Sequence, residues 1–154
     1  ELREQIDAAA DAVREVAHGL SPRILSEQGL GPALEELTAG LPVETDVSWE
    51  GRTGSGAPSP SDEASEDLYL IASEAITNAM KHSGCSRIEV DVARQDDVVQ
   101  LTVRDDGAGG AAPTGRGILS MAARARRLGG TFELVSPDGG PTTVMVRIPS
   151  GGPR

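Results

Sequence analysis

The sequence predicts an α+β fold, with a mixed sheet covered by helices on one face and a separate helix in front. From residue 43 onward, local patterns follow the order strand, helix, two strands, helix, two strands. Strand pairs separated by single helices are typical of an α/β sandwich. Residues 1–22 instead carry the spacing of a helix bundle. We therefore expect residues 1–40 to hold part of a bundle helix and a linker helix, residues 41–150 to form the main domain, and residues 151–154 to be a tail.

The first helix has apolar residues at alternating spacings of four and three. These residues are Leu2, Ile6, Ala9, Val13, Val16 and Leu20. The spacing is that of an a/d seam in a coiled coil or bundle, and Gly19 and Pro22 mark its end. One helix cannot complete such a seam. We therefore expect the chain to be a fragment, or to dimerise through this helix, or both.

The stretch up to residue 84 contains three further elements. Pro32 is placed near the start of a second short helix, where its missing N–H costs nothing. Residues 43–49 alternate apolar and polar side chains, which predicts a half-buried strand. Residues 50–63 have the composition of a flexible loop, and within it Ser61 is expected to be the N-cap of the long helix.

The C-terminal half predicts two hairpins around one helix. Two strands between residues 86 and 107 are joined by a turn at residues 95–97. A glycine-rich loop follows, and then a helix over residues 118–130 with Gly129 at its end. Residues 131–149 form a hairpin with its turn at residues 137–140. Cys85 is expected to serve as a small residue after the end of the long helix.

Composition excludes several classes of protein. The net charge is −10 and the pI is near 4.6, which argues against a nonspecific nucleic-acid binder, because such a protein needs a basic face. An apolar run of about 18 residues, the minimum for a membrane span, does not occur in this sequence. The lone Cys85 cannot form an internal disulfide, in keeping with a reducing compartment. We expect a cytoplasmic location with no membrane contact by these residues, and the sequence leaves open whether the parent protein is membrane-anchored.

The long helix carries a file of polar residues along an otherwise apolar cylinder. Glu74, Asn78, Lys81 and His82 fall within roughly 100° at 3.6 residues per turn. The apolar residues on the other side are Leu68, Ala72, Ala75, Ile76 and Ala79. Such a file is commonly a solvated stripe. A carboxylate and an amide one turn apart, however, also suit a hard cation such as Mg²⁺.

The glycine loops do not match the common nucleotide fingerprints. Neither the dinucleotide pattern G-x-G-x-x-G nor the P-loop pattern occurs at a strand-to-helix junction. What remains is a loop of bare backbone N–H groups that ends at a helix N-terminus, which suits phosphate oxygens. Asp105 stands at a strand end just before the first glycines and adds an acceptor.

Four motifs in order carry a family resemblance. They are "SEAITNAMKHSG", "DDGAGG", "GRGILSMAARARRLGG" and "PTTVMVRIP". Together they resemble the ATP-binding catalytic domain of sensor histidine kinases, within the GHKL or Bergerat-fold ATPases. The short lid between Asp105 and Gly117, without a separate phenylalanine box, resembles the nitrate-sensor-type subclass. The front segment is similar to the second helix of the dimerisation bundle and the linker of those kinases.

This resemblance implies a role for each matching residue. Glu74 matches the catalytic acid of the N-box, and Asn78 matches the amide that holds Mg²⁺. Lys81 and His82 match basic positions near the phosphates, and Asp105 matches the acid that hydrogen-bonds the adenine amino group. The remaining matches are Gly107 and Gly109 in the first glycine box, Gly115 and Gly117 in the second, and Thr142 or Thr143 near the adenine.

The implied activity is transfer of the ATP γ-phosphate to a histidine, where positioning and charge neutralisation supply most of the catalysis. The implied partners are ATP with Mg²⁺, a response regulator with a helix-turn-helix output, and a second copy bound through the first helix. Two alternatives stay open. One is a nucleotide-binding or dimerisation module whose catalysis has decayed, and the other is a GHKL serine kinase of the anti-sigma type.

The sequence also departs from the family pattern. Gly110 stands where an aromatic residue is common, and Pro141 replaces the usual glycine before the threonines. In this subclass the phosphoacceptor histidine lies on the first bundle helix and is followed by an acidic residue. Gly19 follows His18, and His82 belongs to the N-box. We therefore expect the acceptor to lie outside this chain.

Overall fold

The computed structural model describes residues 1–19, 23–49 and 62–150. The predicted loop as far as its N-cap Ser61, the seam residue Leu20 and the tail lie outside the described residues. The side chains of Val16 and His18 also lie outside them.

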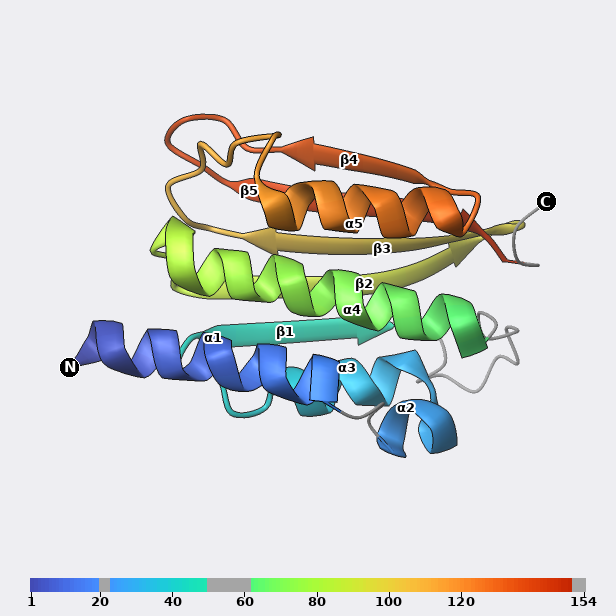
Figure 1. Ribbon diagram of the computed structural model, residues 1–154, viewed down its shortest axis with the longest axis horizontal. Coiled ribbons are helices and arrows are strands. Elements are labelled where there is room, and N and C mark those ends of the chain that lie inside the picture. Colours follow the sequence, from blue (N-terminus) through green and yellow to red (C-terminus); the bar gives the residue numbers. More distant parts are fainter. Residues whose placement is uncertain (20–22, 50–61, 151–154) are drawn as a thin grey trace.

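The described chain forms one mixed sheet with helices on one face (Figure 1). The strand order is β1-β2-β3-β5-β4. The first pair is parallel, and the other pairs are antiparallel. The strands are β1 (Glu44–Trp49), β2 (Arg87–Gln95), β3 (Val98–Asp105), β4 (Thr131–Val135) and β5 (Thr142–Pro149). The helices are α1 (Leu2–Gly19), α2 (Arg23–Gln28), α3 (Leu30–Thr38), α4 (Asp62–Asn78) with its extension η1 (Ala79–Ser83), and α5 (Arg116–Arg127).

The turns and strands follow the predicted patterns. The β2–β3 hairpin closes through Asp96 and Asp97, with Gln95 paired to Val98, as the turn at residues 95–97 predicts. Asp96 has a φ of 54°, a left-handed conformation that aspartate tolerates in tight turns. Strand β1 alternates exposed and half-buried residues, which confirms the half-buried strand predicted there.

The core lies between the sheet and the apolar side of α4, and it is built almost entirely from aliphatic side chains. The predicted inner face of α4 is buried, and the buried side chains of the sheet come mainly from β2, β3 and β5. Fully burying an aliphatic side chain contributes about 1.5–3 kcal/mol. The largest buried side chains of α4 and the sheet include Leu68, Ile71, Ile76, Ile88, Leu101 and Ile148.

Helix α4 changes character at its C-terminal end. Its last turn, η1, is π-helical and ends at Gly84, which has a left-handed φ of 64°. The hydroxyl of Ser83 donates to the Ala79 carbonyl at 2.6 Å, so a side chain satisfies a carbonyl in the widened turn. Cys85 follows this turn, half-buried, and burial raises the pKa of its thiol. This position agrees with the small-residue role predicted for Cys85.

Two features near the N-terminus differ from the sequence-based expectation. Residues 23–38 form two helices, α2 and α3, where one was predicted; Pro32 lies in the first turn of α3 as expected. In addition, α1 packs along α4 and η1 of the same chain. Ala10 and Val13 are buried in this contact, whereas Leu2 at the start of the seam remains 66% exposed. The second helix that the seam requires is thus supplied in part by α4.

Candidate functional site

A cavity of about 760 Å³ opens between the polar side of α4, the end of β3 and the start of α5. It collects most of the site residues predicted from the sequence, although they are far apart along the chain. The predicted residues that line it are Glu74, Asn78, His82, Asp105, Gly109, Gly115, Gly117 and Thr142.

One end of the cavity is formed by Asp105, the last residue of β3. Its carboxylate is buried and accepts a hydrogen bond from the Gly107 N–H at 2.8 Å. Burial raises the pKa of the Asp105 carboxyl, and the Gly107 hydrogen bond offsets part of that rise. Gly107 also packs so tightly on Ser83 that a Cβ there would lie 2.3 Å from the Ser83 Cβ.

The neighbouring Asp106 has the opposite environment. It is exposed, and its carboxylate accepts hydrogen bonds from the backbone N–H groups of Ser86 at 2.8 Å and Arg87 at 2.9 Å. The hydroxyl of Ser86 and these N–H groups lower the pKa of the Asp106 carboxyl. Asp106 therefore fixes the start of β2, while Asp105 faces the cavity.

The loop after β3 is attached to the β4–β5 hairpin. The Gly139 N–H donates to the Ala108 carbonyl at 2.8 Å. At Gly109, φ is +69°, and a Cβ would lie 1.8 Å from the Pro137 carbonyl oxygen. Only glycine fits both the backbone conformation and the close approach. The lining of the cavity at this point thus depends on contact between two segments about 30 residues apart.

Thr142, at the start of β5, joins the same loop to the cavity wall. Its hydroxyl lies 2.7 Å from the Ser136 hydroxyl, which in turn accepts the Ala111 N–H at 2.9 Å. Successive side chains on a strand point to opposite faces, and Thr143 is not among the residues that line the cavity. Of the two threonines left open by the sequence, Thr142 is the one beside the cavity.

The other end of the cavity lies where Glu74 meets the N-terminus of α5. A Cβ on Gly117 would lie 2.3 Å from the Glu74 Oε1 atom, so glycine lets the helix terminus approach the carboxylate. Gly115 is the N-cap and provides no side-chain hydrogen bond, which leaves the first backbone N–H groups to other acceptors. Ser83, against which Gly107 packs at the Asp105 end, lies nine positions after Glu74, or about 13 Å along the helix. The carboxylates of Glu74 and Asp105 therefore mark opposite ends of the cavity.

Lys81 is separated from the rest of the predicted set. Its ammonium donates to Asp11 of α1 at 2.8 Å, and it does not line the cavity. The structure also adds two cations that the sequence-based prediction missed, Arg14 and Arg116. Arg116 lies between two predicted glycines and could have been inferred from that position. Arg14 comes from α1, and nothing in the local sequence places it beside residues 60 or more positions away.

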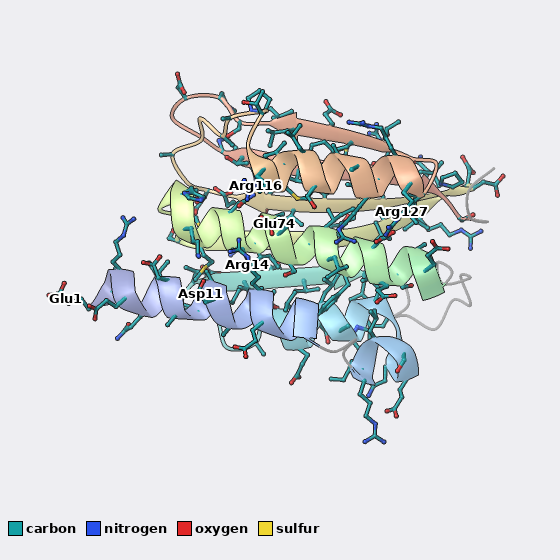
Figure 2. All side chains as sticks on the ribbon, viewed as in Figure 1. Glu1, Asp11, Arg14, Glu74, Arg116 and Arg127 are labelled. Carbon is teal, nitrogen blue, oxygen red and sulfur yellow. The ribbon has the colours of Figure 1, made fainter. Side chains whose placement is uncertain are left out.

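Figure 2 shows Arg14, Glu74 and Arg116 on three neighbouring helices, α1, α4 and α5. Arg14 and Glu74 form an ion pair at 3.7 Å. Within the described part of the chain, no group of three or more His, Cys, Asp or Glu side chains is arranged to hold a metal ion. Across those same residues, no helix combines the length and apolar character needed to cross a membrane.

The comparison with known protein families decides the affiliation of this site. Residues 63–152 match the family described as histidine kinase-, DNA gyrase B-, and HSP90-like ATPase. The chain belongs to this ATPase family. The matched region contains every element that lines the cavity except α1.

Individual relatives narrow the resemblance. The nitrate/nitrite sensor protein NarX of Escherichia coli strain K12 is 35% identical over 156 residues, covering 95% of this chain and 25% of that protein. The sensor histidine kinase MctS of Rhizobium johnstonii is 28% identical, covering 98% of this chain and 34% of that protein. The chain therefore spans about a quarter to a third of the length of these relatives. The predicted resemblance to sensor histidine kinases of the nitrate-sensor type is confirmed.

Solved structures agree on the fold. The histidine kinase domain of the blue-light activated kinase EL346 from Erythrobacter litoralis has a TM-score of 0.59 at 18% identity, covering 93% of this chain and 61% of that one. The ATP-binding domain of PrrB from Mycobacterium tuberculosis has a TM-score of 0.55 at 24% identity, covering 81% of this chain and 92% of that one. The predicted Bergerat-type sandwich is confirmed.

Proposed function

We propose that this chain is the ATP-binding catalytic region of a two-component sensor histidine kinase, and that it transfers the ATP γ-phosphate to a histidine outside residues 1–154. One observation carries the proposal. A single cavity joins the buried Asp105 carboxylate to the Glu74–Asn78 pair beneath the N-terminus of α5. A nucleotide has the matching polarity, with a base that donates hydrogen bonds at one end and phosphates at the other.

The Asp105 end suits adenine. An ionised carboxylate accepts hydrogen bonds only, and one of its oxygens already receives the Gly107 N–H. The other can accept the exocyclic amino group of adenine. Guanine would present a carbonyl oxygen to the same carboxylate. Two hydrogen-bond acceptors would then face each other in a buried site with no donor between them. The site should therefore discriminate strongly between the two bases.

The Glu74 end suits phosphates and Mg²⁺. The free N–H groups at the start of α5 favour phosphate oxygens. Asn78 offers one amide oxygen, and Mg²⁺ usually completes its shell with phosphate oxygens and water. His82 borders the same cavity. Bound Mg²⁺ would neutralise charge on the phosphates, and Glu74 would polarise the attacking group or an associated water.

The remaining assignments follow from the same proposal. A response regulator with a helix-turn-helix output would receive the phosphoryl group, and the intact protein would dimerise through α1. The site would work in the cytoplasm, where ATP is available, and the net charge of −10 opposes direct nucleic-acid binding.

Calorimetric titration of the chain with ATP and GTP, each with Mg²⁺, tests the base-binding assignment. We expect ATP to bind at least roughly tenfold more tightly than GTP. Asp105→Asn should reduce that preference, whereas the matched Asp106→Asn should keep it, because Asp106 faces away from the cavity. Comparable affinities for ATP and GTP in the unmodified chain would refute the role of Asp105.

Incubation with γ-labelled ATP, followed by analysis of acid-labile phosphate, tests where the acceptor lies. We expect the chain to bind ATP without labelling itself. Stable label on His18 or His82 that is lost in the corresponding alanine variant would show that the acceptor is inside this chain.

A further inference from the structure

Arg14 lines the cavity although it belongs to α1, outside the matched ATPase region. Its guanidinium lies 3.7 Å from the Glu74 carboxylate, at the end of the cavity that also holds the N-terminus of α5. In Figure 2 the Arg14 side chain extends from α1 toward Glu74 on α4. This end of the cavity is thus bordered by cations from two different helices, Arg14 on α1 and Arg116 on α5.

The position of Arg14 is fixed by the packing of α1. Ala10 and Val13 are buried on the side of α1 that meets α4 and η1. Asp11, three residues before Arg14 and therefore on the same helix face, accepts the Lys81 ammonium at 2.8 Å. The buried Ala10 and Val13 contacts, with the Lys81–Asp11 pair beside them, thus place Arg14 beside the cavity when α1 is docked on α4.

The Arg14 side chain is also able to change partners. It is 44% exposed, and its contact with Glu74 is a long one at 3.7 Å. A guanidinium presents several N–H donors in a plane that matches phosphate oxygens. A polyphosphate in this end of the cavity would carry more negative charge than the single Glu74 carboxylate. Arg14 would then bind phosphate and release Glu74.

We infer that Arg14 is a phosphate-binding residue supplied by α1, so that nucleotide binding and docking of α1 on α4 are coupled. The inference rests on the proposed ATP site and adds a binding residue to it. If docking of α1 increases the affinity for the nucleotide by some factor, then bound nucleotide shifts the docking equilibrium of α1 by the same factor. The nucleotide and α1 therefore hold each other in place.

Calorimetric titrations with ATP·Mg²⁺ and with adenosine separate a phosphate contact from a structural effect. Arg14→Gln should weaken ATP binding by roughly three- to tenfold, as expected for one partly exposed charged contact. Adenosine binding should not change, because adenosine has no phosphate. Arg14→Lys should restore part of the loss. Arg3→Gln, which removes an exposed cation of the same helix, should leave both affinities unchanged.

Three outcomes would overturn the inference. Unchanged or tighter ATP binding by Arg14→Gln would mean that Arg14 pairs with Glu74 and makes no contact with phosphate. An equal loss for ATP and adenosine would assign Arg14 a structural role. Failure of the unmodified chain to bind ATP would overturn the proposed function and this inference together, whereas the first two outcomes leave the proposed function intact.

Discussion

Helix α4 contacts α5 on one side and α1 on the other through ion pairs of very different kinds. Toward α5, Asp67 is only 3% exposed and receives the Arg124 guanidinium at 2.9 Å and both Nε and Nη2 of Arg127. Toward α1, Lys81 pairs with Asp11, whose side chain is 66% exposed. Arg127 is labelled in Figure 2 near the end of α5 far from Arg116.

The difference indicates which neighbour of α4 is held by the stronger polar contacts. Separation of α5 from α4 would break several charge-assisted hydrogen bonds to the buried Asp67 carboxylate at once, so this contact is costly to break. The α4–α1 pairs reach water and contribute little when intact, because solvent replaces either partner. We therefore expect α5 to stay on α4 under all conditions in which the domain is folded, and α1 to be able to leave.

The largest effect should come from the buried contact. Asp67→Ala removes the carboxylate that receives two arginines and should lower the free energy of unfolding by about 2–3 kcal/mol. Chemical denaturation followed by circular dichroism measures the change. Glu133→Ala, which removes an exposed acid of β4, is the control and should be nearly neutral. A small effect of Asp67→Ala would mean that apolar packing alone holds α5.

A smaller effect should follow from the α1 contact. Lys81→Met should raise the exchange rate of protected α1 amides by roughly two- to fivefold and leave α5 amides unchanged. Added salt should produce the same pattern in the unmodified chain, since exposed pairs are screened and buried ones much less so. Hydrogen–deuterium exchange resolves the two helices. Equal changes in α1 and α5 would contradict the distinction between them.

The smallest effect should be a dependence of the unfolding free energy on pH through the Lys81–Asp11 pair. The hydrogen bond from Lys81, helped by its charge, lowers the pKa of the Asp11 carboxyl. The contribution of this pair is therefore complete above the ordinary carboxyl pKa of about 4 and is lost as the pH falls through the lowered value. The difference in unfolding free energy between the unmodified chain and Asp11→Asn should stay constant from neutral pH to about pH 5, and then shrink. A difference that grows in acid would contradict the assignment.

Local sequence patterns predicted most helices and strands, and they predicted which side of α4 faces the cavity. The alternation over residues 43–49 gave β1, and the polar file on α4 identified Glu74 and Asn78, because both signals depend only on the period of the chain. Helix α2 escaped prediction because its six residues are too few to show a period. The sequence analysis did not single out Asp67, because its burial and its pairing with Arg124 and Arg127 depend on how α5 packs against α4.

The sequence by itself determined the α+β class, the membership in an ATPase family with its motifs in order, and the presence of an a/d seam in residues 1–22. These properties depend on residue type and spacing within short segments. The tertiary structure alone decided that Asp105 faces the cavity and Asp106 does not, that Thr142 rather than Thr143 borders it, and that Arg14 reaches Glu74. Each of these depends on which segments meet across the sheet and between helices, and such contacts cannot be read from residue spacing within one segment.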